Sequence, residues 1–249
     1  MSVNVQRQLA SHKTKTQRMV FLLDVDNTLL DTDRVTADLG RYLEREIGGV
    51  CRQRYWAIFE ELRSELGYAD YLGTLQRYRL EQCSDPHLFS IASFLVNYSF
   101  ANRLFPNSLD VVEWCKAWGT PVILSDGDVV FQPRKIERSG LFEAVDKHVL
   151  IYIHKEQELD DVLRRYPADH YVLVDDKLRI LTAVKQAWGT RVTTVSPRQG
   201  HYANDPDIQK KYLAADVTLN RIGELLDYDG PTLISASRTS NERGLAAGG

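Results

Sequence analysis

The chain has 249 residues, of which 43% are hydrophobic and 26% charged, and its formal net charge is −3. This balance is typical of a globular protein large enough for a core with an insertion, and it lacks the concentrated basic character of a nucleic-acid-binding domain. No apolar run approaches the length of a membrane span. The three widely spaced cysteines show no disulfide or metal-ligand pattern, which favours a reducing, cytoplasmic location.

Both ends of the chain are rich in polar or small residues. Residues 1–17 contain Arg7, Lys13 and Lys15 but no acid and no apolar segment of the kind found in secretory signals. We predict flexible tails at 1–17 and 231–249, with a transit peptide as the alternative for the first.

Five short apolar runs predict the strands of a sheet. They have little polar alternation, as is typical of strands that are buried on both faces of a parallel sheet. The runs are "VFLL" (20–23), "PVIL" (121–124), "HVLIYI" (148–153), "YVLV" (171–174) and "RVTTV" (191–195).

Helical patterns alternate with these strands. They cover 108–118, 131–139, 158–166 and 179–188, and we expect Ser108 to cap the first of them. Glycines at 119, 140 and 189 are placed to end three of the helices. The alternation predicts an α/β class with a Rossmann-like open parallel sheet.

One region breaks the alternation. Residues 34–103 contain no convincing strand but several helical patterns, such as "YWAIFEELRSEL" at 55–66. We therefore predict a core formed by 18–33 and 104–230, with a helical cap inserted at 34–103. The aromatic residues of this insertion are interpreted as its own core; they include Tyr55, Trp56, Tyr68, Tyr71 and Tyr78.

Polar and charged residues follow four of the predicted strands. In an open α/β sheet, ligands bind outside the carboxyl ends of the strands. The residues at these ends are Asp24 and Asp26, Ser125 and Asp126, Lys155, and Asp175 and Asp176. Carboxylates can hold Mg²⁺ and attack phosphorus, while a hydroxyl and a lysine can bind phosphoryl oxygens. Together these residues favour phosphoryl transfer.

The same residues resemble the four motifs of the haloacid dehalogenase-like (HAD-like) hydrolase superfamily. Asp24-Val25-Asp26-Asn27-Thr28 is similar to its first motif, Asp-x-Asp-x-Thr, and Ser125 to the second. Lys155 is similar to the third, and the acid pair at 175 and 176 to the fourth. The order and spacing agree from residue 19 to about residue 228.

The resemblance implies a role for each motif residue. Asp24 is expected to be the nucleophile and a Mg²⁺ ligand. Asp26 is expected to be the acid/base and to offer its backbone carbonyl to the metal. The phosphate-binding residues are expected to be Thr28, Ser125, Asp126 and Lys155, with Thr28 supporting the loop. Asp175 and Asp176 are expected to complete the metal site, and the cap to close over it.

Two positions depart from the family pattern. The second motif usually has Asn where this chain has Asp126, a third acid that would repel a phosphate dianion unless it turns away, binds a cation or is protonated. Lys155 is followed by Glu156 rather than by the common Pro, and Lys147 is the alternative candidate for its role. Asp31, Asp33 and Asp128 are interpreted as solvated loop residues.

Asp26 separates two activities of the superfamily. The resemblance implies that haloacid dehalogenases displace halide with one aspartate and lack the second. The sequence thus favours a Mg²⁺-dependent phosphatase that hydrolyses a small phosphorylated metabolite through an aspartyl-phosphate. A phosphomutase or other phosphotransferase, and a catalytically weak binding or regulatory member, are the alternatives. No nucleic-acid or membrane partner is expected.

Overall fold

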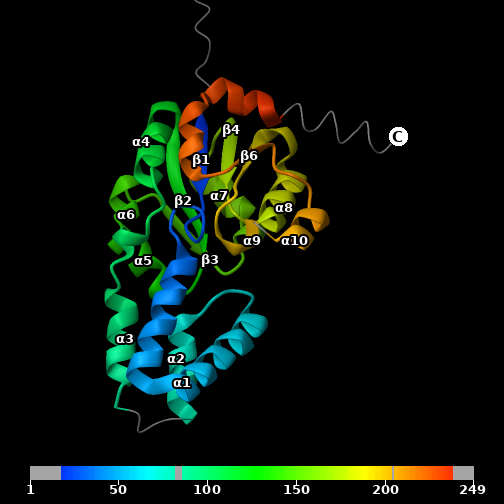
Figure 1. Ribbon diagram of the computed structural model, residues 1–249. Helices are drawn as coiled ribbons and strands as arrows, with labels where there is room; N and C mark the ends of the chain where they lie inside the picture. Colours follow the sequence, from blue (N-terminus) through cyan, green and yellow to red (C-terminus); the bar gives the residue numbers. More distant parts are fainter. Residues whose placement is uncertain (1–17, 82–85, 204, 238–249) are drawn as a thin grey trace, which may run out of the picture.

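The centre of the protein is one six-stranded sheet in the order β3-β2-β1-β4-β5-β6, in which every neighbouring pair is parallel (Figure 1). The computed structural model describes residues 18–81, 86–203 and 205–237. The strands are β1 (Met19–Leu23), β2 (Thr120–Asp126), β3 (Val149–Tyr152), β4 (His170–Val174), β5 (Val192–Pro197) and β6 (Val217–Leu219).

The apolar runs of the sequence lie in this sheet because both of its faces are covered. All five residues of β1 are buried. Phe21 and Leu23 belong to one apolar cluster, whereas Val20 and Leu22 belong to another on the opposite face. The lack of polar alternation in the sequence follows directly from this double burial.

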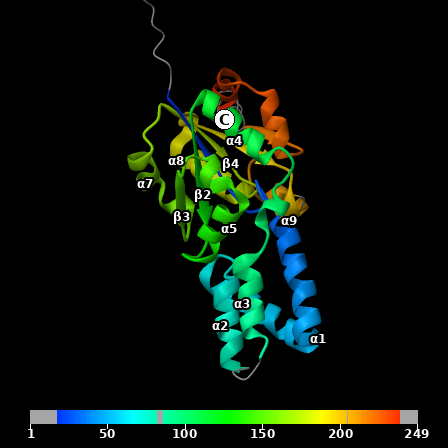
Figure 2. The ribbon, with the colours of Figure 1, turned by 90° about the vertical axis from the view of Figure 1, so that its left-hand side faces the viewer.

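Helices pack on the two faces of the sheet. One face is covered by α4 (Ser108–Trp118), α5 (Phe131–Ser139) and α6 (Leu141–Ala144), and the other by α7 (Leu159–Arg165) and α8 (Leu178–Trp188) (Figure 2). The shorter elements are the 3₁₀ turns η2 (Lys155–Gln157), η3 (Gly189–Arg191) and η4 (Ile222–Asp227) and the helices α9 (Gly200–Ala203) and α10 (Pro206–Lys211).

The predicted helical insertion is confirmed. Between β1 and β2 lie α1 (Thr32–Leu66), α2 (Tyr71–Glu81), α3 (Leu88–Asn97) and the 3₁₀ turn η1 (Phe100–Arg103). A non-helical Gly48 (φ 80°) kinks α1, so the chain turns back over a shared aromatic core. Tyr55 and Tyr78 are fully buried in that core, as predicted. Figure 1 shows the insert as a separate lobe at the carboxyl ends of the strands.

Three local predictions need correction. Strand β3 ends at Tyr152, one residue before the predicted end, and β6 is a three-residue strand that the pattern did not predict. Ser108 does not cap α4, because Asn107 occupies the N-cap position with a positive φ of 69°. The buried Ser108 hydroxyl instead donates a hydrogen bond to the Leu29 carbonyl at 2.7 Å.

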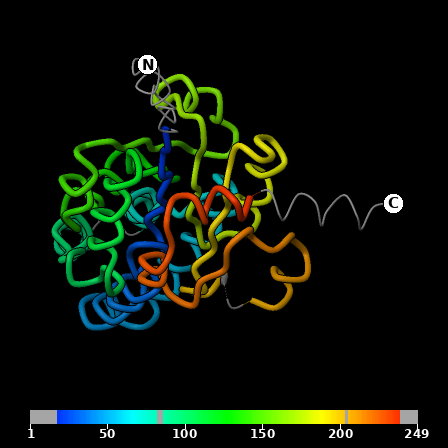
Figure 3. Tube along the Cα trace, turned by 90° about the horizontal axis from the view of Figure 1, so that it is seen from above, coloured from blue at the N-terminus to red at the C-terminus, as the bar shows by residue number. Residues whose placement is uncertain are grey.

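The predicted C-terminal tail begins too early. Residues 230–237 are helical, and Leu233 is fully buried in the core. The Thr193 hydroxyl donates to the Leu233 carbonyl at 2.7 Å, and Figure 3 shows this red segment beside the start of blue β1. The prediction is therefore wrong for 231–237, whereas 1–17 and 238–249 lie outside the described residues. Within the described part of the chain, none of the helices has the length and apolar character needed to cross a membrane.

This packing makes residues 230–237 part of the stable fold. We expect Leu233→Ala to lower the free energy of unfolding by about 2–4 kcal/mol, because it opens a cavity under the last helix. Leu213→Ala is the matched control, because Leu213 is 71% exposed. Urea denaturation measures both; equal, small effects would show that the segment does not contribute to the core.

Candidate active site

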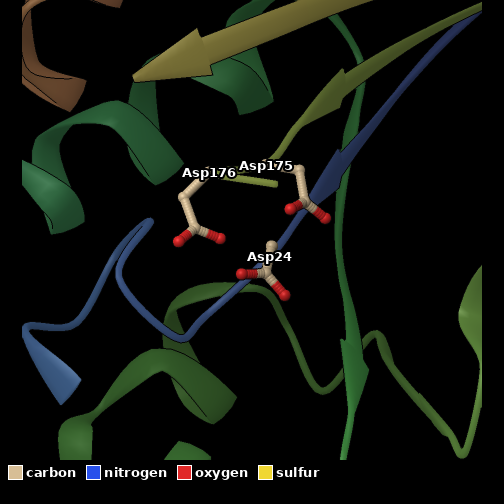
Figure 4. Close-up of side chains that lie close together, drawn as sticks. All are labelled: Asp24, Asp175 and Asp176. Atoms are coloured by element: carbon tan, nitrogen blue, oxygen red, sulfur yellow. The ribbon is translucent and has the colours of Figure 1, made fainter. Parts of the chain in front are cut away.

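Three carboxylates meet where β1 and β4 end. These strands pair with Leu23 opposite Val174, so the residues that follow, Asp24 and Asp175, lie side by side. Carboxylate oxygens of Asp24, Asp175 and Asp176 all lie within 4.8 Å of one another (Figure 4). All three residues are buried, and such a concentration of negative charge needs compensation.

Lys155 provides part of that compensation. Its Nζ lies 2.5 Å from Asp24 Oδ1 and 2.7 Å from Asp175 Oδ2, and the residue is only 1% exposed. Burial opposes the charge on the ammonium, but the carboxylates of Asp175 and Asp24 outweigh it and raise the pKa of Lys155. The alternative, Lys147, is an exposed residue whose ion pair is with Glu143.

Asp176 forms no ion pair within the described residues, although the charges of Lys177 and Lys155 act against the effect of burial on its pKa. Neither of its buried carboxylate oxygens has a hydrogen-bond partner in the described structure. Burial raises its pKa well above the ordinary value, and burial also raises the pKa of Asp24 to about 6. Two free oxygens beside two further carboxylates are the hard oxygen ligands that a divalent cation takes, so these residues fit a metal site.

Thr28 joins the two strand ends, as expected of a loop-supporting residue. Its hydroxyl donates to Asp24 Oδ2 at 3.1 Å and accepts from the Asp176 backbone N–H at 3.0 Å. The side chain is fully buried and both of its hydrogen bonds are to protein, so it holds Asp24 and the backbone of Asp176 in position.

Asp26 faces a different environment. Its Oδ1 lies 2.5 Å from Lys135 Nζ and accepts from the Thr32 hydroxyl, while Oδ2 accepts from Gln132 Nε2 at 2.9 Å. Burial opposes ionisation here too, but Lys135 and the hydrogen bonds lower the pKa of Asp26 below its ordinary value. Its side chain stays outside the three-carboxylate group. The metal contact through its backbone carbonyl stays a prediction.

Gln132 and Lys135 were missed in the sequence. Both are polar residues of α5 that are buried, and Gln132 Nε2 also donates to Ser125 Oγ at 2.8 Å. Gln132 thus connects the ends of β1 and β2. Gln132 and Lys135 are three residues apart, so they lie on the same face of α5 as the buried Phe131 and Ile136. This spacing was the signal in the sequence that could have identified them as buried polar residues.

Asp126 turns its carboxylate toward the backbone that carries Lys155. Its Oδ1 accepts from the Lys155 N–H at 2.7 Å, which orients the 3₁₀ turn η2 after β3. The amide oxygen of the usual Asn could accept the same bond. Burial raises the pKa of Asp126.

The three acids interpreted as solvated loop residues all have structural partners. Asp31 caps α1 by accepting from the Arg34 N–H, and Asp128 accepts from the Val130 and Phe131 N–H groups at the start of α5. Asp33 accepts from Asn27 Nδ2 and from the His201 N–H, each at 2.9 Å. Asp31 and Asp128 are half-buried and lie outside helices and strands, whereas Asp33 lies in α1, so the prediction is wrong for Asp33.

A cavity of about 760 Å³ lies between the core and the insert. Asp26, Asp126 and Asp176 line it from the core, and Arg63 and Tyr68 from the insert. Of the three-carboxylate group, Asp176 lines this cavity, whereas Asp24 and Asp175 do not. The cavity is much larger than a phosphoryl group and is partly walled by α1 and by the turn that follows it.

Comparison with known proteins agrees with this fold. Residues 19–187 match the family model described as haloacid dehalogenase-like hydrolase. A crystal structure from Burkholderia xenovorans LB400, described as a haloacid dehalogenase-like hydrolase, is 60% identical with a TM-score of 0.83, and the match covers 86% of this chain and 100% of that one. No curated protein matches the chain.

More distant structures share the fold. The HAD-hydrolase YfnB from Bacillus subtilis, bound to magnesium, is 16% identical with a TM-score of 0.57, over 86% of this chain and 98% of that one. L-2-haloacid dehalogenase from Xanthobacter autotrophicus, with chloropropionic acid covalently bound, is 18% identical with a TM-score of 0.53. That match covers 85% of this chain and 97% of the dehalogenase. By its family match and its 60% identical relative, the chain belongs to the haloacid dehalogenase-like hydrolases.

Proposed function

We propose that the protein is a Mg²⁺-dependent phosphatase that hydrolyses a small phosphorylated metabolite through an aspartyl-phosphate on Asp24. The observation that carries the proposal is the second aspartate, Asp26, which is fixed at the mouth of a site where Asp24, Asp175 and Asp176 can hold a divalent cation. The magnesium-bound relative YfnB supports the choice of cation.

Each residue has a defined part in the reaction. Asp24, Asp175 and Asp176 would hold Mg²⁺, which when bound offsets the charge of the carboxylates and the phosphoryl group. An Asp24 oxygen attacks phosphorus, the bond from phosphorus to the leaving oxygen breaks, and Asp26 gives that oxygen its proton. Asp26 then takes a proton from water, whose oxygen attacks phosphorus and breaks the bond to Asp24. Lys155 and Ser125 bind the phosphoryl oxygens.

The surroundings of Asp26 suit its second task in particular. Lys135 and Gln132 hold it as a carboxylate, which is the form that deprotonates water. The arrival of a phosphate dianion raises the pKa of a nearby carboxyl by repulsion, which favours proton uptake for the first step.

The first experiment is a panel of phosphate monoesters with and without Mg²⁺. We expect phosphate release that requires Mg²⁺ and falls by at least about 10³-fold in Asp24→Asn, because an amide is not a nucleophile toward phosphorus. Lys147→Gln is the charge-removing control at the rejected motif position. Full activity in Asp24→Asn would overturn the proposal, and transfer of phosphoryl to a second alcohol without free phosphate would make the protein a phosphotransferase.

Asp26→Asn separates the phosphatase from a dehalogenase. Phosphate release should fall by about 10²–10⁴-fold, because the leaving oxygen and the attacking water lose their proton-transfer group. A dehalogenase needs no proton on departing halide. Chloride release from 2-chloropropionate that survives Asp26→Asn, with no phosphatase activity in the wild type, would contradict the proposal.

Asp176→Asn tests the metal site by stability. In metal-free protein near pH 7, the free energy of unfolding should be about 1–3 kcal/mol higher for the variant than for the wild type. The variant removes a buried carboxylate whose two oxygens have no hydrogen-bond partner in the described structure. The raised pKa of Asp176 means that the wild type gains stability as pH falls from neutral, since the folded state takes up the proton first. The variant should lose the part of this gain that comes from Asp176 and keep the part that comes from Asp24 and Asp126. Mg²⁺ should stabilise the wild type in denaturant titrations and the variant far less; equal stabilisation would place the metal elsewhere.

A further inference from the structure

The cavity wall carries two cations that the catalytic proposal does not use, and one of them, Lys177, directly follows Asp176 in the chain. Arg63 comes from the last turn of α1 in the insert, and Lys177 directly precedes α8 in the core. Both line the cavity, and both lie against one ring: Arg63 Cζ is 5.7 Å and Lys177 Nζ 5.9 Å from the centroid of Tyr202.

Neither cation is firmly paired. Lys177 forms no ion pair with any residue that the structure describes, and Arg63 has only a 3.6 Å contact with the exposed Glu60. By contrast, the other buried lysines of the site, Lys155 and Lys135, are held at 2.5 Å by Asp24 and Asp26.

The cavity is large enough for an anion at this wall. Its volume of 760 Å³ far exceeds that of the transferred phosphoryl group, so there is room for the leaving group as well. The ring of Tyr202 lies near both cations and attracts their charge. A guanidinium and an ammonium in a half-buried site are the groups that recognise a carboxylate or a phosphate.

We propose that Arg63 and Lys177, placed by Tyr202, form a second anion subsite that binds a carboxylate or phosphate on the leaving group of the substrate. This inference rests on the proposed phosphatase function and narrows its substrates to phosphate esters with a second negative charge. Because Arg63 belongs to the insert and Lys177 to the core, the second anion links the two parts of the protein across the cavity.

Binding of unreactive phosphonates tests the inference without turnover. Calorimetry with Mg²⁺ compares phosphonoacetate, 3-phosphonopropanoate and 4-phosphonobutanoate with alkylphosphonates of the same length, and a propane bisphosphonate separates phosphate from carboxylate as the preferred second group. We expect at least one compound with a second anionic group to bind about tenfold more tightly than the alkylphosphonate of the same length.

Variants then locate the preference. Arg63→Gln and Lys177→Gln should each reduce it by about fivefold or more, whereas Lys177→Arg should keep most of it. Lys210→Gln is the matched control, since Lys210 is 79% exposed on α10 and does not line the cavity. Thermal unfolding of each variant confirms that it is folded.

The outcomes separate the two proposals. If the compounds with a second anionic group bind no more tightly than the alkylphosphonates, the subsite alone is overturned. The same holds if the preference for the second anion is unchanged in both Arg63→Gln and Lys177→Gln. Equal weakening of every phosphonate by Lys177→Gln would assign Lys177 to the transferred phosphoryl group and also overturn it. If no phosphonate binds with Mg²⁺, the proposed phosphatase function fails together with the subsite.

Discussion

The concentration of negative charge at the ends of β1 and β4 is the constraint on which the site depends. The parallel register puts Asp24 beside Asp175, and the chain adds Asp176 next to them. The ammonium of Lys155 pairs with Asp24 and Asp175, whereas neither carboxylate oxygen of Asp176 has a hydrogen-bond partner in the described structure. The fold tolerates this cost because the large core stabilises it elsewhere, and a divalent cation bound at the proposed site would remove the cost.

Asp24 and Asp26 are only two residues apart, yet their environments shift their pKa values in opposite directions. Burial raises the pKa of Asp24 to about 6, whereas Lys135 lowers that of Asp26 below the ordinary value despite burial. Pairs of titratable groups separated in this way are typical of sites that assign different tasks to similar side chains. The fully buried Val25 between them holds the loop and keeps the two carboxylates in separate surroundings.

The sequence predicted the strand ends well and the supporting residues poorly, for a physical reason. Strands buried on both faces produce uninterrupted apolar runs, and the residue after each run must lie at the carboxyl edge of the sheet. The pairing of Lys135 with Asp26 depends instead on how α5 packs across β1 and β2, which no local pattern encodes. Residues 230–237 were missed because the buried positions of this helix are Gly230, Leu233 and Ser237, of which only Leu233 is a large apolar residue, so the sequence shows no apolar periodicity.

The division between core and insert explains why specificity is harder to derive than chemistry. Every group that the proposal assigns to bond making comes from the carboxyl edge of one sheet, where register fixes its position. The opposite wall is assembled from α1 of the insert and from the segment near Tyr202, which approach each other only through the fold. Asp33, Asn27 and His201 join these two parts where the chain leaves the core. Changes in the insert can therefore alter the wall that faces the leaving group without disturbing the carboxylates.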